Sequence, residues 1–335
     1  MEIEEKERFE AIDVMKCILI IFVIVGHNPN LVNGNIQRII YWFHMPLFFI
    51  VGGYLFKSNH QKSWSRRTTL KYLIPYFSYF ALDCLLQRNI SINNGIKFLY
   101  GGRMYPGVYW FIPCMLLTLL IFHWLNRNFS NKTNLLIILI MYIAAHLESI
   151  FFLPYDGDYL NWNIIYQIPL NLDICLISIP YFAIGYYLKN IILKIVKKSN
   201  VISFFAISLI CLAFIELNLS GILFYKLNMK LGHYYNFILD ILIPVIFGIW
   251  ILITSTLISK FISKFAKMLS IIGMNTLPIM YLHITINGLI LRKINYGILM
   301  YIVIGIIPAL IFNYICSKNR YLEIFFKGKM PNGII

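Results

Sequence analysis

The chain has 335 residues, of which 59% are hydrophobic and only 13% are charged, and its mean hydropathy is +0.72. About a quarter of the residues in a soluble domain are charged, so this composition excludes a large water-soluble core and indicates a polytopic membrane protein. The net charge of +15 would suit a nucleic-acid-binding protein. However, the positive residues lie in short segments between apolar runs, where they determine membrane topology, so we expect no nucleic-acid partner.

Ten apolar runs are long enough to cross a membrane, since a transmembrane helix needs about 20 mainly apolar residues. In chain order the predicted spans cover residues 11–30, 36–57, 70–88, 107–125, 135–153, 170–188, 200–217, 234–258, 268–290 and 296–316. They predict an all-α polytopic membrane protein with about ten transmembrane helices. No long hydrophilic block lies at either end, so we expect one membrane domain over residues 1–335, with residues 1–10 and 317–335 as short terminal segments.

The distribution of basic residues predicts the orientation of these spans. With the N-terminus inside, the inner segments hold 20 of the Lys and Arg residues and the outer segments hold 8. Segments on the cytoplasmic side carry the excess of positive charge. Both termini are therefore predicted to lie in the cytoplasm.

This orientation predicts that polar side chains from different spans share one depth near the outside, at a helical rise of 1.5 Å per residue. The residues concerned are His27, His44, Trp110, His146, Glu148, Asp173 and His283. Ionisable groups in a membrane are costly unless they pair or function, and histidine transfers protons near neutral pH. The pattern predicts a polar cavity open to the outside. His146 and Glu148 face apart at i and i+2 and form no ready dyad.

The cytoplasmic side carries a second pattern. The basic residues Lys57, Lys62, Arg66, Arg67 and Lys71 crowd one short loop, and such a patch attracts a polyanion. The alternative is a topology signal in contact with membrane lipid headgroups. Lys16 lies inside the first span near its inner end, as does Asp13, and either binds an anion or extends to the interface.

Motifs spread over the whole chain carry a resemblance to a known family. They are Ile12-Asp13 through Gly26-His27, Phe43-His44-Met45-Pro46-Leu47-Phe48-Phe49, Gly53-Tyr54-Leu55, Arg66-Arg67, Pro75-Tyr76, Trp110-Phe111, Asp173, Pro180-Tyr181-Phe182-Ala183-Ile184-Gly185, Gly273-Met274-Asn275-Thr276 and Tyr281-Leu282-His283. With them the chain resembles the acyltransferase 3 family of integral-membrane O-acyltransferases, and most of all its branch of fucose 4-O-acetylases and related sugar acetyltransferases. Many members carry an arginine eleven residues before the first histidine. Lys16 stands there in this chain and keeps the charge but not the bidentate fork.

The resemblance implies acyl transfer, in a bacterial cytoplasmic membrane, from a cytoplasmic acyl-CoA to a hydroxyl of an extracytoplasmic or cell-surface glycan. Acetyl-CoA is the expected donor. Its phosphates would lie near Arg66, Arg67 and Lys71, and its pantetheine arm would pass Lys16. No metal is expected, because the intramembrane histidines on separate helices lack local ligand spacing. The sequence gives no oligomeric state.

The predicted reaction centre is His27, which would act as the base for the sugar hydroxyl. Asp173 or Glu148 could orient it, and His44 or His283 could hold the acceptor or stabilise the oxyanion. Glu148 and Trp110 are further candidates for binding the acceptor. An acyl-histidine intermediate stays open beside direct transfer.

Other residues and other classes of function also stay open. Trp110 could stack on a sugar or anchor the chain at the interface. The protein could be a transporter or flippase for a glycan precursor, although the paired repeats of many transporters are not found. A non-catalytic scaffold in a glycan-assembly complex is a third possibility. The sequence has no GxSxG, HExxH or P-loop motif that would indicate a neighbouring enzyme class.

Overall fold

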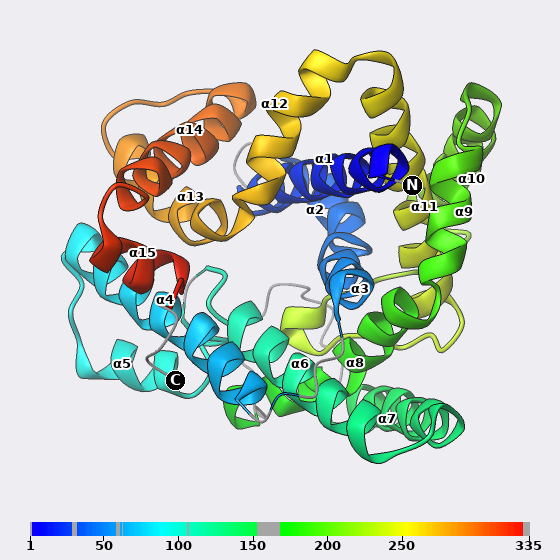
Figure 1. The fold of residues 1–335 in the computed structure, drawn as a ribbon, viewed down its shortest axis with the longest axis horizontal. Coiled ribbons are helices and arrows are strands. Elements are labelled where there is room, and N and C mark those ends of the chain that lie inside the picture. Colours follow the sequence, from blue (N-terminus) through cyan, green and yellow to red (C-terminus); the bar gives the residue numbers. More distant parts are fainter. Residues whose placement is uncertain are drawn as a thin grey trace. The chain divides into compact units, whose positions relative to one another are not determined.

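The computed structural model describes residues 2–28, 32–57, 61, 63–105, 107–152 and 168–330. These residues form helices and no named β-strand (Figure 1). The first helices are α1 (Glu2–Gly26), α2 (Gly34–Tyr41), α3 (His44–Leu55), α4 (Trp64–Gln87), α5 (Ile92–Leu99), α6 (Phe111–Asn128) and α7 (Asn131–Phe152). The next are η1 (Pro169–Asn171), α8 (Leu172–Tyr187), α9 (Lys189–Lys198), α10 (Val201–Leu219), η2 (Met229–Leu231) and α11 (Leu239–Phe261). The last are α12 (Ser263–Met274), α13 (Thr276–Leu291), α14 (Ile298–Cys316) and α15 (Arg320–Lys327).

The all-α membrane fold is confirmed, and each of the ten predicted spans coincides with a helix or a pair of helices. Among the described residues, six helical stretches are long and apolar enough to cross a membrane, or seven if α12 and α13 form one broken span. The predicted spans 11–30, 70–88 and 107–125 coincide with α1, α4 and α6, which do not meet that criterion over the described residues. The total of ten spans and their orientation stay predictions.

Two predicted spans are interrupted. The second is divided into α2 and α3 around Trp42 and Phe43, so that His44 becomes the first residue of α3. The ninth is divided into α12 and α13 at Asn275. Breaks in membrane helices are tolerated where protein surrounds the freed backbone, and here they place polar side chains at helix ends.

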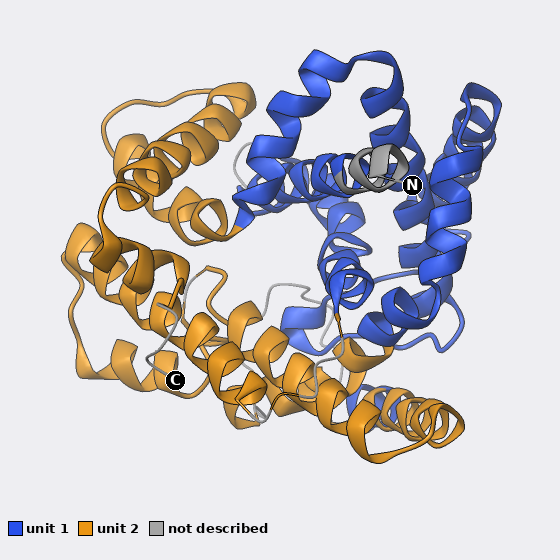
Figure 2. Cartoon of the chain, in the orientation of Figure 1, with its two compact units in different colours: residues 1–56, 146–151, 181–276 blue, residues 57–145, 152–180, 277–335 orange. Residues whose placement is uncertain are grey.

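The helices form two compact units, coloured blue and orange in Figure 2. Unit 1 comprises residues 1–56, 146–151 and 181–276, and unit 2 comprises residues 57–145, 152–180 and 277–335. The division runs through α7 and α8, so each unit contains part of both helices. The units are described separately below.

In unit 1, glycines let helices approach backbone to backbone. A Cβ added to Gly53 of α3 would lie 1.8 Å from the carbonyl oxygen of Phe182, and one added to Gly185 of α8 would lie 1.8 Å from that of Ile50. Gly273 of α12 is equally close to the carbonyl of Asp13 in α1, at 1.7 Å. Small residues at helix contacts are a common packing device in membranes. They give a structural reason for the glycines of three sequence motifs.

In unit 2, α4 packs against α6 and α15, and an aromatic cluster joins it to α5. The ring of Phe80 in α4 stacks on that of Phe98 in α5, with centroids 3.8 Å apart, and Tyr76 stacks on the same ring at 4.2 Å. Tyr76 also donates a hydrogen bond to the Phe98 carbonyl over 3.1 Å. These contacts fix the short amphipathic helix α5, which hydropathy alone does not predict.

Candidate functional site

His27 follows the last residue of α1 and is half-buried. Its Nδ1 lies 2.7 Å from the carbonyl oxygen of Val23, four residues earlier. A carbonyl oxygen only accepts hydrogen bonds, so Nδ1 carries the proton and Nε2 carries the lone pair. The backbone of α1 thus fixes the tautomer in which Nε2 is the basic nitrogen.

The start of the second predicted span packs against the end of α1. Gln37 donates a hydrogen bond from Nε2 to the Gly26 carbonyl over 2.7 Å, and the Tyr41 hydroxyl donates to the same oxygen over 3.1 Å. The Tyr41 ring lies 5.2 Å from the ring of His44, centroid to centroid. The structure therefore brings the two histidine-bearing segments together through Gln37 and Tyr41. We call His27, Gln37, Tyr41 and His44 the histidine site.

His44 is buried, with 4% of its surface exposed. Its Nδ1 lies 2.7 Å from the Ile40 carbonyl oxygen, so it too presents Nε2 as the lone-pair nitrogen. The break between α2 and α3 makes this possible, because His44 begins a helix and still reaches one turn back. Gln37 and Tyr41 were not predicted from the sequence. The sequence feature that could have indicated them is their i, i+4 spacing, which puts both side chains on one helix face shortly before His44.

Lys16 forms an ion pair with Asp13 in α1, with 2.7 Å between Nζ and Oδ1. Each side chain is 19% exposed. Ser270 of α12 lies 3.5 Å from the other carboxylate oxygen of Asp13, close to where Gly273 meets the Asp13 backbone. The pair is thus held against α12 and is partly accessible to solvent.

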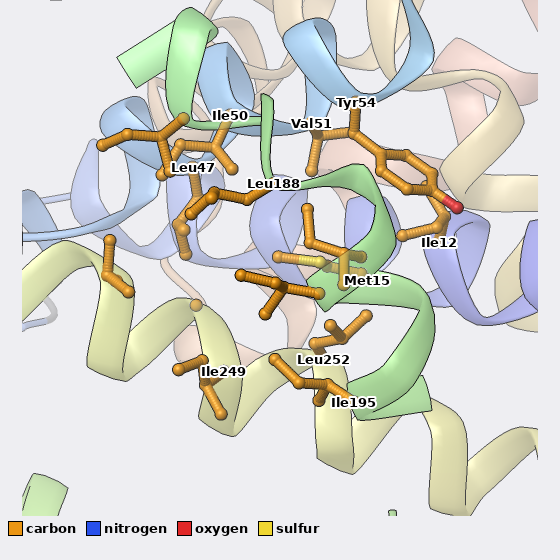
Figure 3. A pocket seen from close by; sticks show the side chains of 15 residues that line it. Ile12, Met15, Leu47, Ile50, Val51, Tyr54, Leu188, Ile195, Ile249 and Leu252 are labelled. Atoms are coloured by element: carbon orange, nitrogen blue, oxygen red, sulfur yellow. The ribbon is translucent and has the colours of Figure 1, made fainter. Parts of the chain in front are cut away.

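An apolar pocket of about 90 Å³ lies on the same stretch of α1 (Figure 3). Its walls come from α1, α3, α8, α9 and α11, and side chains such as Met15, Leu188 and Leu252 point into it. Met15 precedes His27 by twelve residues, or about 18 Å along a helix. The lining is almost entirely apolar, with the Tyr54 hydroxyl as its one side-chain polar group, so we do not assign the reaction to this pocket.

A buried pair that the sequence did not reveal lies elsewhere in unit 1. His146 of α7 and Asp240 of α11 are both fully buried, and Nε2 of His146 lies 3.0 Å from Oδ2 of Asp240. The Asn236 backbone N–H donates to the same oxygen over 3.0 Å. Glu148, a predicted acceptor residue, is half-buried on α7. The sequence signal for this pair was that His146 and Asp240 are ionisable residues within two predicted spans, because ionisable groups in a membrane need partners.

In unit 2, Asp173 pairs with Arg103. The guanidinium Nη1 donates to Oδ2 of Asp173, and each side chain is 1% exposed. This pair joins the loop before α6 to the first turn of α8 and gives the buried arginine a partner of opposite charge. Asp173 belongs to unit 2 and His27 to unit 1, so the orientation of His27 by Asp173 stays a prediction.

Two further predicted residues lie in unit 2. Trp110 precedes α6 and is 3% exposed, and its carbonyl oxygen accepts a hydrogen bond from the Asn171 side chain over 2.9 Å. His283 is fully buried in α13, with Nδ1 2.9 Å from the Ile279 carbonyl oxygen. Arg66, Arg67 and Lys71 are exposed on the first turns of α4. Lys62 lies outside the described residues.

Asp83 of α4 is a second ionisable residue that the sequence did not single out. It is 3% exposed and accepts hydrogen bonds from three side chains of unit 2. One is the Tyr105 hydroxyl at 2.7 Å. Burial and the contact with the Asp83 carboxylate raise the pKa of the Tyr105 phenol, because both disfavour the phenolate. Tyr105 therefore stays a hydrogen-bond donor at neutral pH.

Comparison with known proteins identifies the family of the chain. Residues 9–318 match the family model described as an acyltransferase domain. No curated protein and no solved structure gives a significant match. The match spans nearly all helices of both units, including the histidine site and the Arg103–Asp173 pair. The chain therefore belongs to the acyltransferase 3 family and is a membrane acyltransferase.

Proposed function

We propose that this membrane acyltransferase moves an acetyl group from cytoplasmic acetyl-CoA to a sugar hydroxyl of an extracytoplasmic or cell-surface glycan, in a bacterial cytoplasmic membrane. The observation that carries the proposal is the hydrogen bond between Nδ1 of His27 and the Val23 carbonyl. It leaves Nε2 as the base that a hydroxyl nucleophile requires.

In the proposed reaction, Nε2 of His27 accepts the proton of the sugar hydroxyl as the oxygen attacks the thioester carbonyl carbon. The carbon–sulfur bond then breaks, and the CoA thiolate leaves with the proton that His27 returns. A general base of this kind gives about 10²–10⁴-fold in rate. His44, which presents Nε2 as a lone-pair nitrogen, would hold the acceptor by accepting a hydrogen bond from one of its hydroxyls.

The donor would be held by basic residues on the cytoplasmic side. Arg66, Arg67 and Lys71 are exposed and close together on one helix end, as phosphate binding requires. Lys16 would bind a further part of the donor and exchange its ion pair with Asp13 for a contact to the donor. Lysine binds phosphate as a point charge.

The proposal is tested by the mass of surface glycans from cells with the gene intact or deleted. Acyl transfer predicts that deletion removes one acetyl mass per modified repeat and leaves the glycan otherwise complete. Mild alkali should remove the same mass from the wild-type glycan, because it hydrolyses O-esters. Loss of the entire glycan on deletion would contradict the proposal and support a glycan transporter.

A further inference from the structure

A cavity of about 130 Å³ with both apolar and polar lining lies within unit 2, outside the residues discussed for the reaction. Its walls come from the end of α4, the loop before α6 and one face of α13. The residues that matter for its chemistry are Asp83, Gln87, Tyr109, Tyr281, Thr285 and Arg292. We call this set the Asp83 pocket. Tyr281, Thr285 and Gly288 of α13 and Arg292, the residue after its end, recur at spacings of three to four, so they line one face of the helix.

The Asp83 carboxylate is fixed by neutral donors. Thr285 donates its hydroxyl proton to Oδ1, Gln87 donates from Nε2 to Oδ1 over 2.7 Å, and Tyr105 donates to Oδ2 over 2.7 Å. No lysine or arginine among the described residues forms an ion pair with Asp83. A carboxylate has about four lone-pair positions, so it can accept one more hydrogen bond from a ligand.

The rest of the pocket supplies complementary groups. Gln87 uses its amide N–H on Asp83, which leaves its carbonyl oxygen as an acceptor. Arg292 is exposed and forms no ion pair with the described residues. Tyr109 and Tyr281 add aromatic walls, with ring centroids 5.4 Å apart. Acceptors, a donor and aromatic faces therefore surround one cavity.

This combination selects a polyhydroxylated ligand. Each sugar hydroxyl both donates and accepts, and the carbon face of a sugar ring packs against aromatic side chains. A metal ion does not fit, because three donors already direct hydrogens at the carboxylate and Arg292 adds positive charge. A lipid chain does not fit either, since it would cover the open acceptor position of Asp83 and the Arg292 guanidinium without a hydrogen bond to either group.

We infer that the Asp83 pocket binds one sugar unit of the glycan acceptor. One sugar hydroxyl would donate a hydrogen bond to Asp83, and other sugar oxygens would accept hydrogen bonds from Arg292. This inference rests on the proposed function for the identity of the ligand. The predicted orientation agrees with it, because the ends of α4 and α13 that form the pocket face the outside, where the acceptor would be.

Gly288 of α13 provides a test that does not disturb the fold. It lines the pocket, and a Cβ added there would meet no atom within 4 Å. Because the space at this position is open to a Cβ, Gly288→Leu should occupy much of the cavity and Gly288→Ala should occupy less of it. Gly95 of α5 also has open space around an added Cβ and lies outside the pocket, so Gly95→Leu is the matched control.

The experiment measures saturation-transfer NMR between the purified full-length protein in detergent and oligosaccharide repeats prepared from the glycan of a deletion strain. We expect the wild type and Gly95→Leu to bind the repeats equally. Gly288→Leu should bind at least tenfold more weakly, and Gly288→Ala should fall between them. Arg292→Gln changes an exposed side chain and should weaken binding of the repeats severalfold. This variant replaces Gly288→Leu as the test if Gly288→Leu does not fold.

Two results would overturn the inference. One is equal binding by the wild type, Gly288→Leu and Arg292→Gln, and the other is no binding of the repeats by the wild type. A separate assay of acetyl transfer by the wild type keeps the two proposals apart. Binding that depends on Gly288 without any transfer would refute the proposed reaction and retain the pocket. Transfer that is unaffected by Gly288→Leu would refute the pocket and retain the reaction.

Discussion

The Nδ1 nitrogen of His27 lies 2.7 Å from the carbonyl oxygen of Val23, one turn earlier in the chain. His44 and His283 make the same contact, with the Ile40 and Ile279 carbonyls at 2.7 and 2.9 Å. Because a carbonyl accepts only, all three predicted histidines carry their ring proton on Nδ1 when neutral. In the neutral form, Nε2 is then the lone-pair nitrogen of each ring.

His44 provides the first prediction. If its Nε2 holds the acceptor, a glutamine side chain should replace part of that role and alanine should not. We expect His44→Gln to keep acetyl transfer within about tenfold of wild type and His44→Ala to lose about 10²–10³-fold. The measurement is the initial rate of acetyl transfer to oligosaccharide by purified protein. Equal rates for the two variants would refute a hydrogen-bonding role.

Lys16 provides the second prediction. A charge-assisted hydrogen bond contributes about 1.5–3 kcal/mol, so Lys16→Ala should raise the KM for acetyl-CoA by about 10–100-fold. Lys16→Arg should bind the donor about as well as lysine, because it retains the charge. The measurement is the dependence of the initial rate on acetyl-CoA concentration. A KM for Lys16→Ala equal to that of the wild type would remove Lys16 from the donor site.

The basic start of α4 provides the third prediction. Arg66→Ala with Arg67→Ala should raise the KM for acetyl-CoA more than it lowers kcat, because uniform binding is lost. The effect should shrink at high salt, since these side chains are exposed and screened.

The control for that experiment is Arg127→Ala with Lys132→Ala. Both residues are exposed and belong to another segment predicted to lie inside. We expect this control to leave KM unchanged. An equal rise in the KM for acetyl-CoA in both double variants would indicate that any positive charge on this side attracts the donor, and it would refute a specific donor site at the start of α4. An inverted topology of the Arg66/Arg67 variant would assign these residues to membrane orientation.

The buried ion pair of unit 2 provides the fourth prediction. Removing one partner of such a pair leaves an uncompensated charge and costs about 3–5 kcal/mol. Arg103→Met should therefore lower the Tm of the purified protein and its abundance in the membrane. Arg103→Met with Asp173→Leu should recover much of the loss, because no charge is then stranded. If the double variant is no more stable than Arg103→Met, the pair does not account for the burial of Arg103.

Much of the fold follows from the sequence because hydropathy reports span-length helices directly. Each predicted apolar run became a helix or a helix pair. The break at Trp42 and Phe43 was missed, since both residues are apolar and a hydropathy window averages across them. The helix α9 was missed for the opposite reason. Its ten residues include four lysines, so it lies between two spans as an amphipathic segment with no hydropathy signal.

The partners within the candidate site could not be predicted, because they are distant in sequence. Arg103 and Asp173 are 70 residues apart, and Asp83 and Thr285 are 202 apart. Burial of ionisable residues in predicted spans signals that partners exist but does not identify them. The role of Gly273 was also hidden. Its motif was visible in the sequence, but its contact with the Asp13 backbone depends on how α1 and α12 pack.

The central claim is that His27 is the base for acyl transfer to a sugar hydroxyl. The direct measurement is the transfer of radiolabel from [acetyl-¹⁴C]acetyl-CoA to oligosaccharide from a deletion strain, by purified wild type and His27→Ala at equal protein concentration. We predict that His27→Ala remains folded and abundant and transfers at least 10²-fold more slowly. Transfer at the wild-type rate by His27→Ala would contradict the claim.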